Sequence, residues 1–398
     1  MKIIERQGYL NQLKNVKNTP DIKVITGIRR AGKSKLMRAF ADFVKESEPD
    51  CNVIFIDFAK ITFEKLKDYH KLNDYVENHA AADVINYLFI DEVQLCNNFE
   101  ITINSLHSSE KYDIYLTGSN AFMLSSDLAT LFTGRHLEIH VFPFSFYEYC
   151  KYFEINDNFQ VAFDRYVLEG GLSGSYVYKN SNDKEDYVKK VYNTILTRDL
   201  TEKYKIADTQ VLMRLAEYMM DNVSNITSPN NVANVLTSNK ISTNHVTVGK
   251  YVDYICNAYL FYKVDRYDIK GKKYLESLNK YYLADTGIRY AMLGRRNMDW
   301  GRIYENIVFL ELLRRDYRVY IGKLYQKEID FVAIRGDEKI YIQVSDDLSS
   351  EQTFKREIEP LLSVPDAYPK FVIARTKHEE YDYQGIKIVD LVNWLMTE

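Results

Sequence analysis

The sequence has few of the residues that stabilise small secreted proteins, and it has no long apolar run. Of its 398 residues four are cysteine and seven are proline. The two closest cysteines, Cys51 and Cys96, lie 45 positions apart, so no pair has the spacing of metal ligands and a reduced, cytoplasmic setting is expected. No stretch of about 18 uncharged apolar residues occurs, and residues 1–6 lack the apolar core of a signal peptide. We therefore expect neither membrane insertion nor secretion.

The charge of the chain is nearly balanced, which excludes a uniformly basic protein but allows a local basic patch. The 52 Lys and Arg residues face 56 Asp and Glu residues, a net charge of -4. With 46% hydrophobic and 27% charged residues, the composition is that of a globular protein and not of a disordered chain. A chain of this length is expected to form about two to four domains.

The first 145 residues predict an α/β fold built on a parallel sheet. Short runs rich in β-branched residues alternate with helical patterns, as in a sheet that helices cover on both faces. The expected strands are 22–26, 53–58, 87–90, 114–117 and 137–142.

Three further parts are expected after this core, which spans 1–145. Residues 146–207 have the pattern of a helical lid, with a glycine break at Gly170-Gly171. Residues 208–282 show helices, a polar turn and two short strands, and 283–398 form a second α/β domain. The last part is expected to contain a helix over 303–315 and strands over 319–322, 328–334, 339–344 and 371–374.

The strongest motif is a phosphate-binding loop between the first expected strand and the helix that follows it. Glycines let the backbone wrap a phosphate, so that successive N–H groups point inward at a helix N-terminus. Lys33 would reach the β- and γ-phosphates of a nucleotide, and the Ser34 hydroxyl would ligate Mg²⁺. The loop consists of Gly27, Ile28, Arg29, Arg30, Ala31, Gly32, Lys33 and Ser34, which match G-x-x-x-x-G-K-[ST].

Two later strands end in polar residues that suit nucleotide hydrolysis. After the third expected strand, Asp91 would hold Mg²⁺ through water, and Glu92 would polarise the attacking water. After the fourth, a polar sensor near the γ-phosphate is expected, with Thr117, Ser119 and Asn120 as candidates and the last two favoured. The alternatives are a solvated acidic pair at the first position and a capped turn at the second.

Together with several later motifs, these residues resemble the AAA+-type prokaryotic ATPases that carry a C-terminal domain of unknown function, number 4143. The resemblance implies ATP and Mg²⁺ as ligands, and an AAA+-like sheet followed by a helical lid, a winged helix and a restriction-endonuclease-like tail. One departure is Ser173, since the family commonly has proline after its Gly-Gly-Leu-like run. The motifs that carry the resemblance are 27–34, 88–92, 116–120, Gly134-Arg135, 142–148, Gly170-Gly171, 304–306 and 328–331.

Arg135 follows the sensor strand by about 18 residues, near the place where AAA+-like proteins have an arginine finger. A guanidinium there would offset charge that develops on the transferred phosphoryl group, and it would come from a neighbouring subunit. This hypothesis implies a homo-oligomer. The alternative is a surface arginine that begins the strand at 137–142.

Residues 208–282 fit a winged helix with a modest basic excess. Between residues 205 and 290 there are 11 Lys and Arg and 8 Asp and Glu, a net charge of +3. DNA is therefore a candidate partner, although winged helices also serve as protein-interaction modules. The candidate phosphate contacts are Lys263, Arg266, Lys270, Lys272 and Lys273, and the candidate base contacts are Asn244, His245 and Thr247.

The tail departs from an active metal nuclease. Such a site needs a helix carboxylate, a strand aspartate, and an acid and a lysine on the next strand. Glu305 and Asp330, with Glu328, fill the first two places, but Gln343 and Ser345 stand in the last two. A neutral amide is a poor Mg²⁺ ligand and serine supplies no cation, so we expect an inactive tail.

The favoured function is ATP hydrolysis that couples nucleotide state to a DNA-related or assembly process. One alternative is a nucleotide-gated protein-interaction module with slow hydrolysis and no DNA role. A metal-dependent nuclease is the third hypothesis.

Overall fold

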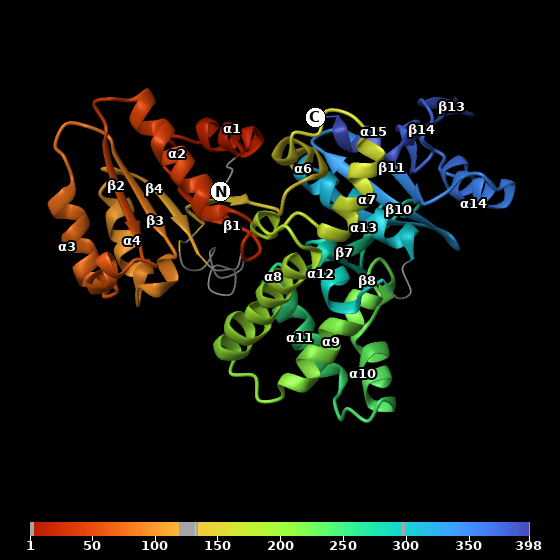
Figure 1. Cartoon of the computed structure of the whole chain (residues 1–398), viewed down its shortest axis with the longest axis horizontal. Coiled ribbons are helices and arrows are strands. Elements are labelled where there is room, and N and C mark those ends of the chain that lie inside the picture. The colour runs from red at the N-terminus through yellow and green to blue at the C-terminus, as the bar shows by residue number, and fades with distance from the viewer. Residues whose placement is uncertain (1–3, 119–131, 133, 296–298, 398) are drawn as a thin grey trace. The chain divides into compact units, whose positions relative to one another are not determined.

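The computed structural model describes residues 4–118, 132, 134–295 and 299–397. The chain divides into two compact units, one that ends at Val141 and one that begins at Phe142 (Figure 1). We describe each unit by itself. In the parts of the chain that the structure describes, no helix is both long and apolar enough to cross a membrane.

The N-terminal unit contains a five-stranded parallel sheet with the strand order β2-β3-β4-β1-β5 (Figure 1). This confirms the α/β class and the parallel sheet that the sequence predicts. Its strands are β1 (Ile22–Thr26), β2 (Asn52–Asp57), β3 (Asn86–Asp91), β4 (Tyr112–Thr117) and β5 (His136–His140). Its helices are α1 (Gln7–Asn15), α2 (Lys33–Ser47), α3 (Tyr69–His79) and α4 (Phe99–Ser108).

The interior strand β3, between β2 and β4, shows why the sheet is covered on both faces. All six of its residues are buried. Leu88 and Ile90 belong to the hydrophobic cluster that includes residues of α3 and α4. Phe89 points the other way, and its ring lies 6.2 Å from that of Phe40 on α2. Because successive side chains of a strand alternate between faces, a continuous apolar run places helices on both sides.

The second unit begins with helices and continues into a nine-stranded mixed sheet. Its first helices are α6 (Phe146–Phe153), α7 (Phe159–Glu169) and α8 (Ser181–Thr194), which runs into a π-helical segment, Ile195–Glu202. Then follow α9 (Thr209–Asp221), β6 (Ile226–Thr227), α10 (Pro229–Ser238), α11 (His245–Asn257), β7 (Phe261–Asp268), β8 (Lys273–Leu283) and α12 (Thr286–Leu293). The last elements are α13 (Trp300–Arg314), β9 (Arg318–Leu324), β10 (Lys327–Arg335), β11 (Glu338–Ser345), α14 (Glu351–Leu362), β12 (Lys370–Ala374), β13 (Tyr381–Tyr383), β14 (Ile386–Asp390) and α15 (Leu391–Met396).

The nine-stranded sheet crosses the boundary that the sequence places between 282 and 283. Its strand order is β13-β14-β12-β11-β10-β9-β7-β8-β6. The join is the parallel pair β7 and β9, in which Arg266 lies opposite Ile321 and Asp268 opposite Lys323. The β7–β8 hairpin therefore continues the sheet of the tail. The division of the chain into four parts stays a prediction.

Two of the sequence motifs meet at one close-packed junction of the second unit. Ser145 caps α6 in a reciprocal arrangement with Glu148, which explains the run at 142–148. The Phe144 N–H donates to the Gly171 carbonyl at 2.9 Å, and the Gly171 N–H donates to the Asp285 carboxylate at 2.5 Å. A Cβ atom on Gly171 would lie only 2.2 Å from the Phe144 carbonyl oxygen. The second glycine of the Gly-Gly motif is thus required by backbone contact.

Candidate nucleotide-binding site

The phosphate loop leaves β1 at the carboxyl edge of the N-terminal sheet and leads into α2. Gly27 has a φ of +129°, and a Cβ atom there would lie 2.1 Å from the carbonyl oxygen of Val141. Gly32 has a φ of +102° and precedes the first turn of α2. Ile28 and Ala31 are buried, which anchors the loop between its glycines. The loop therefore has the backbone shape that presents N–H groups to an anion at a helix N-terminus.

The Lys33 ammonium lies within the loop. Its Nζ donates to the carbonyl oxygens of Gly27 at 2.7 Å and Ile28 at 3.1 Å, and the side chain is buried. Arg6, which is also buried, braces the loop from outside by donating to the Ala31 carbonyl at 3.1 Å. Sequence reasoning missed Arg6, because an arginine before a first helix carries no motif. These contacts hold the lysine beside the loop backbone.

A hydroxyl and a carboxylate from two different elements meet next to the loop. The Ser34 hydroxyl donates to Oδ1 of Asp91 at 3.0 Å. The same carboxylate oxygen accepts a hydrogen bond from the Thr117 hydroxyl. Burial raises the pKa of Asp91, while the hydrogen bonds from Thr117 and Ser34 act in the opposite direction. The structure thus brings together the two residues from which sequence reasoning expected metal ligation.

Glu92 follows Asp91 at the end of β3, in a left-handed conformation. Its φ is +57°, which is uncommon for a residue with a side chain. Its N–H donates to the Thr117 hydroxyl at 3.2 Å, and its Oε2 accepts from the Gln94 side chain at 2.5 Å. The first contact holds the backbone of Glu92 and the second its carboxylate, and the residue is only partly buried. The candidate base therefore stands beside the Ser34–Asp91 pair.

Thr117 is the member of the sensor group that the structure places in this site. It bonds both Asp91 and the backbone of Glu92, so it couples the two acidic residues. Ser119 and Asn120, which the sequence favoured, lie outside the described residues. The signal that favours Thr117 is its position as the last residue of β4, beside β3.

A second polar group beside the loop was not predicted. The Thr26 hydroxyl donates to Glu138 at 2.6 Å and lies 3.0 Å from Nδ1 of His140. Burial, and after it the positive charge of Lys33, lowers the pKa of His140 to about 3. His140 is therefore neutral near pH 7. Its signal in the sequence was weak, because a histidine at a strand end has many structural uses.

Arg135 lies away from the loop of its own chain. It is exposed and directly precedes β5, and its carbonyl accepts from the Ile22 N–H at 3.0 Å. Ile22 begins β1, whereas the loop follows the end of β1, so a whole strand separates them. Five residues at ~3.3 Å each give a separation of about 16 Å. The phosphate loop has two arginines of its own: Arg29 is half-buried, and Arg30 is exposed with a φ of +69°.

The carboxylates that the sequence singled out in the tail come together around a lysine. Nζ of Lys280 lies 2.9 Å from Glu305, 2.8 Å from Glu328 and 3.9 Å from Asp330. This lysine comes from β8, whereas the nuclease motif places its lysine at position 345, which is serine here. The motif therefore did not predict Lys280. Gln343 has structural partners: it accepts from the Asp330 N–H at 2.7 Å and donates to Glu357 at 3.0 Å.

A cavity of about 460 Å³ borders this cluster. Within the described ranges, no group of three or more His, Cys, Asp and Glu residues is arranged to hold a metal ion. The lysine ammonium supplies positive charge to these carboxylates. The restriction-endonuclease-like identity of the tail is not confirmed.

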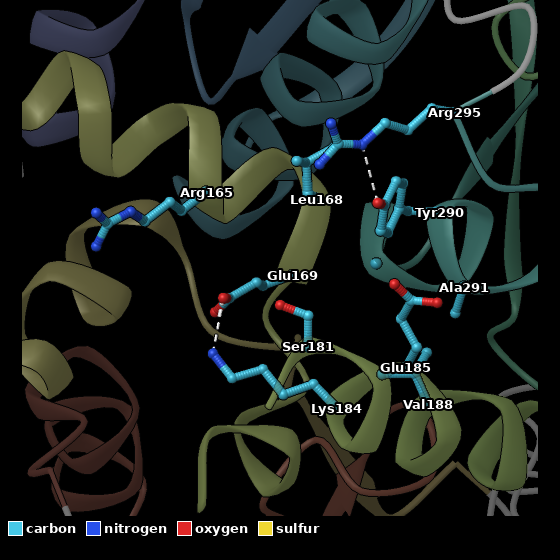
Figure 2. A pocket seen from close by; sticks show the side chains of 11 residues that line it. Arg165, Leu168, Glu169, Ser181, Lys184, Glu185, Val188, Tyr290, Ala291 and Arg295 are labelled. Carbon is cyan, nitrogen blue, oxygen red and sulfur yellow. Dashed lines mark hydrogen bonds and ion pairs between the residues drawn. The ribbon is translucent and has the colours of Figure 1, made fainter. Parts of the chain in front are cut away.

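Figure 2 shows another pocket of the second unit, which α7, α8 and α12 line. Its volume is about 290 Å³. Lys184 and Glu169 form an ion pair of 2.7 Å across one wall, and Arg295 donates to the Tyr290 hydroxyl at 3.0 Å. Because these charged groups are engaged with neighbouring side chains, the pocket offers no convergent set of one charge, unlike the phosphate loop.

Comparison with protein families gives the class of the N-terminal unit. A model described as an AAA domain matches residues 19–150, which contain the loop, Asp91 and Glu92. A second model, domain of unknown function 8612, matches residues 160–299. The domain number 4143 that the sequence resemblance suggested is not confirmed, and the matching model ends at residue 299, near the start of the tail.

The chain also has a relative along its whole length. An uncharacterized protein of Haemophilus influenzae is 35% identical over 399 residues, which cover 99% of each chain. This chain belongs to the same family as that protein. An uncharacterized protein of Methanocaldococcus jannaschii is 27% identical and covers 98% of this chain and 86% of its own length.

Solved structures give only distant likenesses. The Aeropyrum pernix ORC1 protein in complex with DNA is 9% identical, with a TM-score of 0.32 over 73% of this chain and 92% of that one. The replication initiator DnaA bound to AMPPCP and single-stranded DNA is 17% identical, with a TM-score of 0.33 over 64% and 89%.

Proposed function

We propose that this protein hydrolyses ATP with Mg²⁺ and couples its nucleotide state to a DNA-related or assembly process. The observation that carries the proposal is the Ser34 hydroxyl 3.0 Å from the Asp91 carboxylate, next to a loop that holds Lys33. The AAA domain match over this region supports it. ATP binding would place phosphates where the loop N–H groups and Lys33 converge.

The donor set at this position fits Mg²⁺. Mg²⁺ prefers oxygen ligands and keeps several waters, so one hydroxyl and one carboxylate beside the substrate phosphates suit it. Ser34 is exposed, which leaves the pair open to a ligand, and Asp91 is buried, which holds it in place. The bound ion would neutralise phosphate charge. Ser34 would contribute its hydroxyl, and Asp91 would act through water.

Each remaining group has one chemical task in this proposal. Lys33 leaves the loop carbonyls and binds the β- and γ-phosphates. Glu92 orients the attacking water and accepts its proton, and Thr117 holds the backbone of Glu92 while bonding Asp91. Gln94 fixes the Glu92 carboxylate before substrate binds.

Arg135 would act on the nucleotide of a neighbouring subunit. A separation of about 16 Å along β1 and β5 is too long for its side chain to reach its own loop. An exposed arginine at the opposite edge of the sheet is free to meet another copy of the chain. The proposal therefore includes a homo-oligomer in which each site is completed by two chains.

A mixing experiment tests the shared site. Arg135→Ala and Glu92→Gln are each expected to bind ATP and to lose most hydrolysis, because each lacks one catalytic group. Mixed together, they form some interfaces in which both groups are intact, so ATPase activity should recover in part. Arg135→Lys, which keeps the charge but loses the planar fork, serves as a matched control. Normal hydrolysis by Arg135→Ala alone would remove the finger from the proposal.

The DNA-related part of the proposal rests on the middle of the second unit. The element order α9, β6, α10, α11, β7 and β8, with β6 and β7 both paired to β8, supports the proposal of a winged helix. The N-terminal end of α11 is exposed at Asn244 and His245, where a recognition helix presents its side chains. The remaining parts would be a helical lid over 146–207 and an inactive tail over 283–398.

The competing function is a nucleotide-gated interaction module without a DNA role. Its support is the exposed position of Arg135, a whole strand away from the loop of its own chain. An arginine finger at this position would act only in an assembly of several chains, and it would need no DNA. Measuring ATPase rate against protein concentration, with and without duplex DNA, separates the two. Salt-dependent stimulation by DNA favours coupling to DNA, whereas a rate that rises only with protein concentration favours the module.

A further inference from the structure

A surface of lysines and exposed tyrosines forms where two hairpin turns lie side by side. One turn joins β7 to β8, and the other joins β9 to β10. The two strands β7 and β9 are paired up to Asp268 and Lys323, and the Ile269 N–H continues the pairing by donating to the Lys323 carbonyl at 3.0 Å. Both turns therefore lie at the same end of the sheet. We call their shared surface the tip surface: Lys270, Lys272, Lys273, Tyr274, Tyr320, Lys323 and Tyr325.

The tip surface carries an excess of positive charge. The segments 268–274 and 322–328 contain five lysines and two acidic residues. Asp268 accepts the N–H groups of Lys270 and Gly271 and so is committed to its turn, and Glu328 is paired with Lys280 of the tail cluster. Lys272, Lys273 and Lys323 have no ion-pair partner among the residues that the structure describes. The surface thus offers several cations to an anionic partner.

The aromatic side chains of the tip surface are unusually open to solvent. Tyr274 is 60% exposed and Tyr325 is 64% exposed, each in a sheet hairpin and not in a loose terminus. The ring of Tyr274 lies 4.9 Å from that of Tyr320, which stiffens it, and the Lys270 ammonium lies 4.6 Å from the centre of the Tyr325 ring. Rigid exposed rings among lysines are the chemistry by which proteins hold unpaired bases and their phosphates.

We infer that the tip surface binds single-stranded nucleic acid. Lysines would follow the phosphates, while Tyr274 and Tyr325 would stack on bases. A duplex keeps its bases stacked internally, so the exposed rings favour a single strand. The inference rests on the proposed coupling to DNA but changes its location, from the end of α11 to a surface that the tail helps to build. It explains why Tyr325 and Lys323, which lie outside 208–282, stand beside the β7–β8 hairpin.

The test measures fluorescence anisotropy of labelled oligo-dT of about 20 nucleotides, and of a duplex of the same length, without ATP. The double variant Tyr274→Ala, Tyr325→Ala should bind oligo-dT roughly 5- to 150-fold more weakly per base that stacks. The corresponding Phe variant should bind within about twofold of the unaltered protein, because the ring is kept. Tyr381→Ala, Tyr383→Ala removes two exposed tyrosines of β13, at the far edge of the same sheet, and should change nothing.

Lysine variants give a second, independent measure. The triple variant Lys272→Ala, Lys273→Ala, Lys323→Ala should reduce the slope of log affinity against log salt by about 2, since each phosphate contact to a single strand contributes about 0.7. Tyr325→Trp should show fluorescence that oligo-dT quenches, which reports stacking even where another variant folds poorly.

Three results would overturn the inference. The Tyr274→Ala, Tyr325→Ala variant could keep full affinity for oligo-dT, or it could lose as much affinity for the duplex as for oligo-dT. The third result is that the unaltered protein does not bind oligo-dT. Because the binding assay contains no ATP, its result can be interpreted even if the protein does not hydrolyse ATP. Normal ATPase activity with any of these three results would refute the tip surface alone.

Discussion

Replacing Lys280 by methionine should destabilise the second unit strongly. The Lys280 side chain is 5% exposed, and its ammonium lies within 4 Å of three carboxylates. Burial alone would lower the pKa of Lys280, but Glu305, Asp330 and Glu328 outweigh it and raise the pKa overall. Methionine fills a similar volume without charge, so the change isolates the electrostatic contribution. It leaves the buried Glu305 and the partly buried Asp330 with no lysine beside them.

The size of the effect follows from that geometry. Removing one partner of a buried ion pair typically costs about 3–5 kcal/mol, because the remaining charge stays desolvated. For a unit of this size, each kcal/mol shifts the melting temperature by about 2–4 °C. Calorimetry should therefore show the transition of the second unit falling by about 6–20 °C, while the affinity of the N-terminal unit for ATP stays unchanged.

The pH dependence gives the reasoning a sharper check. Burial already raises the pKa of Glu305 and of Asp330, and Lys280 opposes both shifts. Without Lys280 both pKa values rise further, so the folded variant binds more protons than the unfolded chain. Its stability then falls as pH rises, and its deficit should shrink toward pH 5. Adding Glu305→Gln to Lys280→Met should restore much of the stability, and a melting temperature within 1 °C of the unaltered protein in the single variant would refute the argument.

Other expectations follow from single contacts. Lys33→Ala should abolish ATP binding in a folded protein, because the phosphates lose their principal cation; titration calorimetry with ATP checks this, and unchanged affinity would refute the site. Gly171→Ala should prevent correct folding of the second unit, since its Cβ would lie 2.2 Å from the Phe144 carbonyl oxygen. Gly249 lies within α11, and a Cβ atom there would lie 3.9 Å from its nearest neighbour, the Pro229 side chain, so Gly249→Ala should be neutral or stabilise by up to about 1 kcal/mol in urea unfolding. The lowered pKa of His140 means that the unfolded chain binds its proton first, so the N-terminal unit should lose stability as pH falls below about 6.5, and His140→Asn should flatten that part of the profile.

The N-terminal unit was readable from sequence because each of its features is local. The loop, its strand and its helix are consecutive, and the apolar run before Asp91 predicts a buried strand by itself. The parallel direction of the strands then follows from the helices that lie between them along the chain. What sequence could not supply were contacts between distant segments, such as Arg6 at the Ala31 carbonyl, or the choice of Thr117 as the residue that bridges the acidic pair.

The tail shows the complementary limit. Four of its strands and α13 were expected, but α12, which precedes α13, was not. β13 and β14 are short or carry a weak pattern, and α14 contains a proline at 360. Serine stands at position 345, where the usual nuclease constellation has lysine, and the inactive tail expected from it stays a prediction. The lysine that meets these carboxylates lies 65 positions earlier, at Lys280, and no spacing rule connects it to them. Only the pairing of β7 with β9 brings the two segments together.

The pairing of β7 with β9 also bears on whether residue 282 separates two parts that fold independently. If 208–282 folded alone, β7 would leave its β9 edge unpaired and Lys280 would lack its carboxylate partners. If 283–398 folded alone, Glu305 and Asp330 would lack their cation. Each half therefore carries a cost that only the other removes. A helix-rich segment and an α/β segment that look separable along the chain are coupled through one sheet and one lysine, so a ligand that shifts the hairpin must act on both.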